Sequence, residues 1–289
     1  MTTDYSLHTH TFGFDGRNTE EQMIIAARAR GMKTLGFSNH FIVHPYIKKS
    51  RMYGYAVRGG YSNIYNDSVE NAIKLFSVHY DNVRNLREKY TDMNILCGME
   101  MDWFQYDGWR DVVNYAVRRL NPDYVIGAMH FIDRGPDGVL NVHDIRNANP
   151  RDSGRLLREY YQNLMKLAAF DWRDMGFKFN WIAHFDLPKK VGLNYRDMEH
   201  ASLTELAKYQ MPIELNLSLI MNHNYLILSD IFDKISDLGL PVVISDDAHD
   251  TARIGADFDS MLRIAGTHGI KNVCVKSDML KKFVGVRTY

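Results

Sequence analysis

The chain has 289 residues, of which 45% are hydrophobic and 24% are charged, a composition typical of a folded globular protein and not of a disordered one. Lys and Arg together number 35, as do Asp and Glu, so the formal net charge is zero and we expect neither nucleic acid nor an acidic membrane as a partner. Cys97 and Cys274 are the two cysteines, and each lies in an apolar run, which excludes a disulfide-stabilised secreted scaffold.

The sequence shows no export signal, no membrane span and no linker between domains. The first residues do not combine a basic segment with an apolar core, and no run approaches the roughly 18 uncharged apolar residues of a membrane span. No linker, repeat or low-complexity tract divides the chain. We therefore expect a cytoplasmic protein with a single domain over residues 1–289.

Short apolar runs alternate along the chain with longer segments of helical period. Seven runs predict strands, at 5–10, 34–40, 94–104, 124–131, 181–186, 212–218 and 241–249. Helices are expected at 19–31, 62–90, 109–120, 152–173, 198–209, 228–238 and 251–268. Such alternation requires crossover connections and a mainly parallel sheet, either open and doubly wound or closed into a barrel. Seven or eight units favour an α/β barrel with its helices outside.

One segment, residues 51–65, is rich in aromatic residues and glycine and fits neither period. Because it directly follows the second strand, we interpret it as a loop over the active face, with an ordinary surface excursion as the alternative.

Polar side chains of metal-binding types recur where the predicted strands end. These residues are His8, His10, His40, Glu100, His130, His184, Asn216, Asp247 and His249. In an α/β barrel the carboxyl ends of all strands meet on one face, so residues far apart in sequence become neighbours there. Six of the twelve histidines occupy this kind of position, which independent core histidines have no reason to do.

Two of these strand ends carry a pair of donors. His8 and His10 are two residues apart, so the strand period aims both imidazoles to one side of the backbone, where together they can chelate an ion. Asp247 and His249 repeat this spacing with an oxygen and a nitrogen donor, a combination suited to Zn, Mn or Fe. The simpler interpretation of one such pair, two surface side chains, loses weight because the pattern occurs twice.

Glu100 follows an apolar run in which an unpaired carboxylate would be costly to bury. It either pairs with an arginine or binds a cation, and because its two oxygens can bridge two ions, we expect it to be a bridging ligand. Asp102 lies one strand period further on and is expected to support the site. No glycine-rich phosphate loop follows a strand and no Gly-x-Ser-x-Gly elbow occurs, which argues against nucleotide cofactors and serine hydrolases.

With these residues in place, the chain resembles the polymerase and histidinol phosphatase (PHP) family, in particular its histidinol-phosphate phosphatase branch. The matching segments are HTH at 8–10, FSNH at 37–40, GMEMD at 98–102, GAMHFID at 127–133, AHFDLPKK at 183–190, ELNLS at 214–218 and SDDAH at 245–249. The resemblance implies a distorted seven-stranded (β/α) barrel of TIM-barrel type, holding two or three divalent metal ions (Zn, Mn or Fe) at its carboxyl face.

The resemblance also implies a ligand set for each ion. One ion would take His8, His10, Glu100 and Asp247, and a second would share Glu100 and take His130 and His184. A third would take His40 and His249 with Asp15, the ligand type at a suitable distance after the first motif. On the substrate side, the resemblance implies phosphate contacts from Lys189 and from Arg155 or Arg158, and a supporting or substrate-binding role for Asn216.

The function implied is hydrolysis of a small phosphomonoester, most simply L-histidinol phosphate in histidine biosynthesis, by a metal-bound hydroxide attacking phosphorus. Glu100 would bridge the ions, and Asp247, His249 or a metal-bound water would protonate the leaving alkoxide. One alternative is a related phosphoesterase acting on another small phosphorylated metabolite (a mono-, di- or bis-phosphate), or an amidohydrolase. Another is a non-catalytic metal-binding module, whose sequence sign would be missing ligands.

Overall fold

The structure is a computed structural model that describes residues 3–190, 195–216, 225–256 and 258–287. Its main sheet runs in the order β1-β2-β5-β6-β9-β10-β11-β12, with every neighbouring pair parallel. The strands are β1 Tyr5–Ser6, β2 Thr34–Phe37, β3 His40–Val43, β4 Tyr65–Asn66, β5 Asn94–Asp102, β6 Tyr124–Ala128, β7 Phe131–Asp133, β8 Val139–Asn141, β9 Trp181–Ile182, β10 Ile213–Asn216, β11 Val242–Ser245 and β12 Val273–Cys274.

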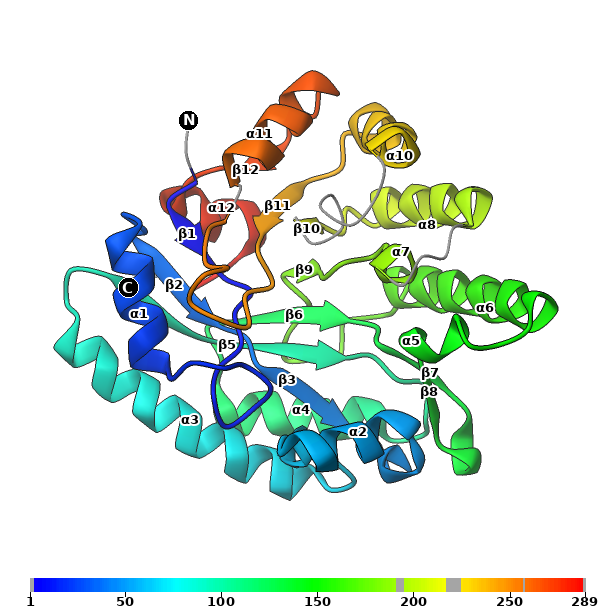
Figure 1. The fold of residues 1–289 in the computed structure, drawn as a ribbon, viewed down its shortest axis with the longest axis horizontal. Helices are drawn as coiled ribbons and strands as arrows, with labels where there is room; N and C mark the ends of the chain where they lie inside the picture. The colour runs from blue at the N-terminus through cyan, green and yellow to red at the C-terminus, as the bar shows by residue number, and fades with distance from the viewer. Residues whose placement is uncertain (1–2, 191–194, 217–224, 257, 288–289) are drawn as a thin grey trace.

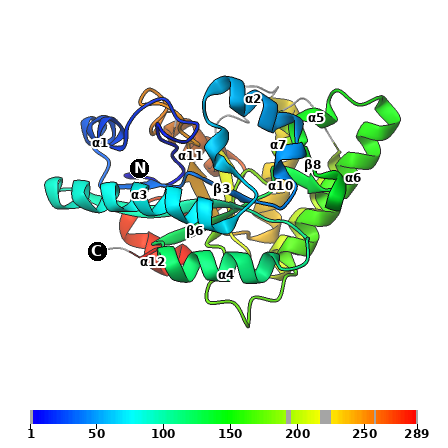
Figure 2. The ribbon, with the colours of Figure 1, turned by 90° about the horizontal axis from the view of Figure 1, so that it is seen from below.

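Helices surround this curled sheet, as Figures 1 and 2 show from two sides. They are α1 Glu20–Ala29, α2 Arg51–Gly59, α3 Val69–Lys89, α4 Trp109–Leu120, α5 Val142–Ile145, α6 Pro150–Ala168, α7 Leu187–Lys190, α8 Arg196–Lys208, α10 Tyr225–Leu238, α11 Phe258–Thr267 and α12 Leu280–Val284. The alternation of parallel strands and outer helices confirms the expected α/β fold.

The sheet curls until its first and last segments touch. Beyond β1 and β11, Thr9 and Ala248 form a parallel bridge, in which Ala248 N–H donates to His8 O and His10 N–H donates to Ala248 O, both at 2.9 Å. At the other end of the curl, Tyr5 Oη donates to the carbonyl of Cys274 in β12. The bridge joins the two predicted donor pairs directly.

Two apolar layers hold the sheet. Side chains from the strands fill the inside of the curl, among them Tyr5, Leu96, Tyr124 and Trp181, and a much larger layer packs between the strands and the helices. Inside the curl, the ring of Tyr124 occupies the space that a Cβ at Gly98 would need. Both cysteines are free and buried, as expected.

The predicted strand over 34–40 is in fact two strands. β2 ends at Phe37, Ser38 and Asn39 belong to no strand, and β3 begins at His40; both strands pair with β5 in one continuous register. In the second ladder His40 stands opposite Glu100. The single-strand prediction was wrong only in that two residues interrupt the strand, and the unchanged register keeps His40 beside Glu100.

The interpretation of residues 51–65 as a loop was also wrong. Most of this segment is helix α2, which Ser50 caps by accepting a hydrogen bond from Met52 N–H and which ends on Gly60 at φ 79°. A short 3₁₀ turn and β4 follow. Met52, Tyr61 and Tyr65 line the cavity described below, so the segment does lie over the face where the donors converge.

Candidate metal centre

Glu100 lies at the centre of the cluster and is fully buried. Its carboxylate approaches five imidazoles: Oε1 lies 3.3 Å from His8, 3.6 Å from His130 and 2.9 Å from His184, while Oε2 lies 3.7 Å from His10 and 2.7 Å from His40. No arginine pairs with it among the described residues, which removes the simpler interpretation of this carboxylate. The two oxygens thus face two different sets of nitrogens, an arrangement suited to a bridging ligand.

The donor pairs of the first and last strands meet through the Thr9–Ala248 bridge. Asp247 Oδ1 lies 3.5 Å from His8 Nε2 and 3.3 Å from His10 Nε2. These two nitrogens also face Glu100, so His8, His10, Glu100 and Asp247 surround one small volume.

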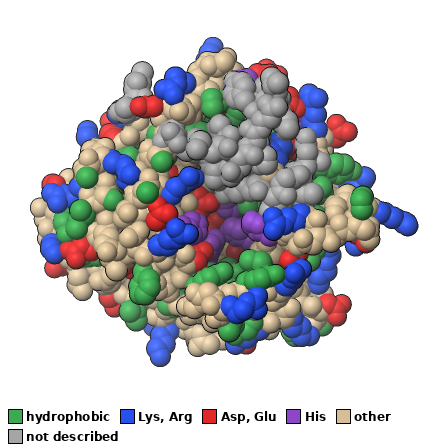
Figure 3. Space-filling model, in the orientation of Figure 1, with side chains coloured by type: hydrophobic (Ala, Val, Ile, Leu, Met, Phe, Trp, Pro, Cys, Tyr) green, Lys and Arg blue, Asp and Glu red, His purple; other side chains and the backbone are tan. Residues whose placement is uncertain are grey.

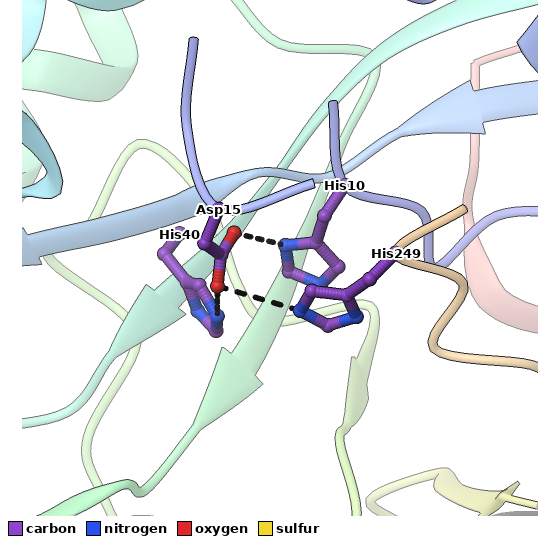
Figure 4. A group of neighbouring side chains, drawn as sticks. All are labelled: His10, Asp15, His40 and His249. Atoms are coloured by element: carbon purple, nitrogen blue, oxygen red, sulfur yellow. Dashed lines mark ion pairs between the residues drawn. The ribbon is translucent and has the colours of Figure 1, made fainter. Parts of the chain in front are cut away.

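A second group, His10, Asp15, His40 and His249, lies nearer the surface and is called the outer group below (Figure 4). The carboxylate of Asp15 holds it together, at 3.4 Å from His10 Nδ1, 3.1 Å from His40 Nε2 and 3.4 Å from His249 Nε2. Asp15 therefore lies beside His40 and His249, the two histidines with which the family resemblance grouped it. His10 belongs to both groups because its two nitrogens face opposite ways.

His130 and His184 approach Glu100 from the far side, with ring centroids 4.8 Å apart. Asp102 supports His130 from behind: its Oδ2 lies 3.1 Å from the ring Nδ1, and its Oδ1 accepts the backbone N–H at 2.9 Å. This contact fixes Nδ1 as a donor and turns Nε2 toward Glu100. Asp102 thus supports the cluster, as the sequence predicted.

Two of the clustered residues have backbone conformations that L-residues rarely adopt. His184 has φ 23° and Asp247 has φ 48°, both in the left-handed region. Strain of this kind costs on the order of 1–3 kcal/mol per residue and persists where the surrounding structure imposes it, most often at functional sites. Both side chains belong to the cluster, with His184 Nε2 2.9 Å from Glu100 Oε1 and Asp247 Oδ1 3.3 Å from His10 Nε2.

Burial and the neighbouring charges shift the ionisation of the cluster strongly. Burial alone would raise the pKa of Glu100, but the surrounding imidazoles, His40 and His8 foremost, bring it well below its usual range. Burial opposes protonation of His8 and His40, yet nearby carboxylates raise the pKa of both well above its usual value. Burial, together with His249 and His40, lowers the pKa of His10.

Several atoms of the cluster are buried without a hydrogen bond. They are His8 Nε2, both ring nitrogens of His10, His40 Nδ1, Asp15 Oδ1 and Glu100 Oε2. Buried polar atoms normally have partners, and clustered orphans that point at one another are explained by a cation among them. Imidazole nitrogens and carboxylate oxygens in this ratio suit Zn, Mn or Fe, so the residues fit a divalent metal centre.

The cluster forms the floor of an open cavity of about 400 Å³. Histidines are visible at the bottom of the hollow in Figure 3, beside acidic and basic side chains. Its other lining residues are Ile42, Met52, Tyr61, Ile64, Tyr65, Phe131, Asn141, His143 and Leu187. An open cavity of this size admits a small metabolite.

The side chains expected to contact phosphate lie elsewhere in the described structure. Lys189 is buried with its Nζ 2.7 Å from Glu199 Oε2, and Arg158 donates to Tyr195 Oη. Arg155 is exposed beside Asp152, and Asn216 donates to Glu214 Oε1 at 3.0 Å. The structure does not bring these four side chains to the described lining of the cavity.

One residue of the cluster was missed at the sequence level. Glu214, fully buried in β10, has its Oε2 2.7 Å from His8 Nδ1 and 3.3 Å from Trp181 Nε1, which donates to it. It turns His8 Nε2 toward Glu100 and Asp247. An acidic residue inside an apolar strand, the same signal that pointed to Glu100, also marks Glu214.

Comparisons with known proteins agree with this arrangement. A curated Deinococcus radiodurans protein assigned as a histidinol-phosphatase is 27% identical over 171 residues, which are 57% of this chain and 62% of that protein. The chain therefore matches less than two thirds of that relative's length.

Two solved structures share the fold. A histidinol phosphate phosphatase of Lactococcus lactis, solved with Zn, L-histidinol and phosphate, superposes with a TM-score of 0.70 at 15% identity, covering 99% of both chains. A Listeria monocytogenes protein assigned as a histidinol phosphatase gives a TM-score of 0.67 at 16% identity, covering 89% of this chain and 99% of that one. At these identities the likeness concerns the fold, which is the distorted barrel expected from the sequence.

The model of the PHP domain family matches residues 4–218, from the strand that precedes His8 to just past β10. This span includes the described donors His8, His10, Asp15, His40, Glu100, His130 and His184, and stops before Asp247 and His249. The chain is therefore a member of the PHP domain family.

Proposed function

We propose that the protein is a metal-dependent phosphomonoesterase whose substrate is L-histidinol phosphate. The observation that carries the proposal is the buried Glu100 carboxylate, surrounded by imidazoles of which three, those of His40, His130 and His184, line an open cavity. The curated relative and the Lactococcus structure, both described as histidinol phosphatases, support the choice of substrate.

The donor geometry supports an assignment of ligands to three positions. His8, His10, Glu100 and Asp247 would hold one ion; Glu100, His130 and His184 a second; and Asp15, His40 and His249 a third. Divalent ions at these positions would supply Lewis acidity, neutralising phosphate charge and activating water.

The protein's own side chains orient the residues that would bind the ions. Glu214 and Asp102 orient His8 and His130 from behind, so that their Nε2 atoms face the cluster. The described lining of the cavity contains no Lys or Arg, so compensation of the phosphate charge falls to the cations. We assign protonation of the leaving alkoxide to Asp247 or His249, the two cavity-lining groups of the last strand end, through whichever of them is not coordinating a cation at that stage.

The experiment compares phosphate release from histidinol phosphate with that from other phosphate mono- and diesters, using protein reconstituted with Zn²⁺ or Mn²⁺. We expect histidinol phosphate to be the best substrate by kcat/KM. A better diester or unrelated monoester would move the proposal to another phosphoesterase of this family, and no hydrolysis of any phosphate ester by the loaded protein would overturn it.

Glu100→Ala provides the mechanistic arm, with Glu205→Ala on the exposed side of α8 as its control. We expect Glu100→Ala to lose bound metal and at least about a thousandfold in kcat/KM, while the control retains both. Retained activity at full metal content in Glu100→Ala would contradict the bridging role.

A membrane location receives no support from the described helices: none of them is both long and apolar enough to span a bilayer. We propose a small phosphorylated metabolite as the sole partner that the site requires.

A further inference from the structure

His79, on α3, is a buried histidine that the metal centre does not use. It is 4% exposed and lies beside Asn39, in the two-residue gap between β2 and β3. The rings of Phe14, Phe37 and Phe76 surround it, each in an edge-on arrangement. A titratable side chain in so apolar a setting needs a reason, and its hydrogen bonds supply one.

These hydrogen bonds determine which ring nitrogen carries the proton. Asn39 Oδ1 accepts the backbone N–H of Thr11 at 2.8 Å, which fixes the orientation of the amide. Its Nδ2, which can only donate, therefore faces His79 Nε2 at 3.1 Å and Thr11 Oγ1 at 3.0 Å. His79 Nε2 must accept, so the ring proton sits on Nδ1.

The Nδ1–H in turn has a dedicated acceptor. Glu20 Oε1 lies 2.6 Å from His79 Nδ1, and Glu20 Oε2 accepts from Asn82 Nδ2 at 3.0 Å. The result is a continuous chain, Glu20–His79–Asn39–Thr11, in which every donor meets an acceptor. Among the described hydrogen bonds no other orientation of the Asn39 amide satisfies both Thr11 N–H and His79.

This chain ends on the segments that carry the outer group. Asn39 immediately precedes His40, and its carbonyl accepts Glu100 N–H at 3.0 Å. Thr11 immediately follows His10, and Phe14, whose ring centroid lies 5.3 Å from that of His79, immediately precedes Asp15. Three of the four residues of the outer group, His10, Asp15 and His40, are thus next in sequence to a residue that contacts His79 or Asn39.

We propose that His79, kept as the Nδ1–H tautomer by Glu20, is a positioning residue that locks the Asn39 amide and thereby sets the outer group for cation binding. The proposal rests on the metal centre described under Proposed function, although part of its test needs no metal. Removing the acceptor at Nε2 would free the Asn39 amide and loosen both the Thr11 and the His40 segments.

The first measurement is made on metal-free protein. Long-range ¹H–¹⁵N correlation of the imidazoles is expected to show His79 as the neutral Nδ1–H tautomer. In His79→Leu, the ¹⁵N signals of His10 and His40 should shift or broaden, while those of His130 and His184 stay in place. An Nε2–H tautomer, or unchanged His10 and His40 signals in the variant, would overturn the proposal whether or not the protein is a phosphatase.

The second measurement is a calorimetric Zn²⁺ titration of four variants. His79→Gln keeps both interactions, because its amide oxygen can accept from Asn39 and its amide N–H can donate to Glu20, and we expect near wild-type affinity. His79→Leu and Glu20→Ala should weaken one class of site by about ten- to a hundredfold, the range for outer partners of metal ligands. The matched control is His268→Leu, which breaks a similar pair, His268 Nδ1 to Asp233 Oδ1 at 2.7 Å, away from the centre.

The Gln variant separates positioning from packing, since it loses the imidazole ring but keeps the hydrogen bonds. If His79→Gln binds Zn²⁺ as poorly as His79→Leu, the ring is a packing element and the proposal fails. If His79→Leu does not fold, Glu20→Ala decides: weakened Zn²⁺ binding supports the proposal, and wild-type binding overturns it. Wild-type protein that binds Zn²⁺ but hydrolyses no phosphate ester would contradict the proposed function alone.

Discussion

At the scale of single residues, the centre depends on carboxylates that orient imidazoles as much as on those that face a cation. His8 lies between both kinds: its Nδ1 is 2.7 Å from Glu214, and its Nε2 faces Glu100 and Asp247. Without the Glu214 contact the ring could rotate or adopt the other tautomer. The orientation of a ligand is thus set from the side opposite to the ion.

Removal of Glu214 is expected to weaken the centre without touching the cavity. We predict that Glu214→Ala lowers Zn²⁺ affinity and kcat/KM by about ten- to a hundredfold, and that Glu214→Gln, whose amide oxygen still accepts from Nδ1, loses less. Metal content by mass spectrometry and steady-state kinetics provide the readouts, with Glu205→Ala as control. Equal losses in both Glu214 variants would show that charge, and not orientation, is what this residue contributes.

The ionisation of the cluster predicts that protons leave when cations enter. Burial works against protonation of His8 and His40, but the carboxylates around them raise the pKa of each well above its usual value, so the metal-free protein keeps these protons to a higher pH than free imidazoles do. A cation must displace these protons, so affinity should fall as pH falls. Calorimetry in buffers of different ionisation enthalpy should show proton release near neutral pH; a buffer-independent heat would contradict this.

The sequence identified most of the centre because the donor types sit at recognisable strand ends. His8, His10, His40, Glu100, His130, His184, Asp247 and His249 all converge, as expected. Glu214 and His79 were missed because their roles depend on which side chain lies behind a ligand, a relation between distant segments that no spacing encodes. The environment of Lys189, which pairs with Glu199, is hidden in the same way.

At the scale of elements, helix boundaries were predicted where capping signals are local. The pattern over 109–120 gave α4 correctly, and Thr19 caps α1 in a capping box with Gln22. Helix α2 was missed because its tyrosines and glycines read as a loop, although Ser50 and Gly60 carry cap signals at its ends. The interruption between β2 and β3 was missed because an apolar run does not show which of its residues lack a partner in β5.

The packing of α8 against α7 predicts a pH-dependent stability. Burial raises the pKa of Glu199 to about 8, although Lys189 lies 2.7 Å away and acts in the opposite direction. The folded protein therefore binds this proton more tightly than the unfolded chain does. The resulting stabilisation is complete below the unfolded pKa of about 4.3 and is lost as pH rises toward the folded value.

Glu199→Gln mimics the protonated side chain and has no such dependence. We expect the unfolding free energy of the wild type, relative to this variant, to fall by about 2 kcal/mol between roughly pH 6 and pH 8. Urea unfolding at several pH values measures it, with Glu205→Gln on the same helix as control. A pH-independent difference would mean that Glu199 is ionised throughout, as a tight pair with Lys189.

At the scale of the whole molecule, the mainly parallel sheet followed from the alternation of strands and helices, and the number of units favoured a barrel, but the way the curl closes was not predicted. β12 is two residues long and was not predicted, and the Thr9–Ala248 bridge joins backbone segments 239 positions apart. This closure places donors of the first strand beside donors of the last. The centre is therefore built across the seam of the barrel, where an isolated bridge joins the segments that follow β1 and β11.

A cation at this seam should stabilise the entire fold, because it would tie His8 and His10 to Asp247 and so hold the two ends of the sheet together. Zn²⁺ at about a hundred times its dissociation constant contributes about 2.7 kcal/mol per site that only the folded state possesses. For a domain of this size that corresponds to a rise in Tm of several degrees.

Differential scanning calorimetry should show this rise when Zn²⁺ is added and its reversal by a chelator. The same addition of Zn²⁺ to the Glu100→Ala variant should change the Tm of that variant much less. If metal analysis finds Zn²⁺ bound but the Tm of the wild type does not change, the ion lies away from the seam. A ligand that joins the first strand to the last opposes their separation and must therefore raise the Tm.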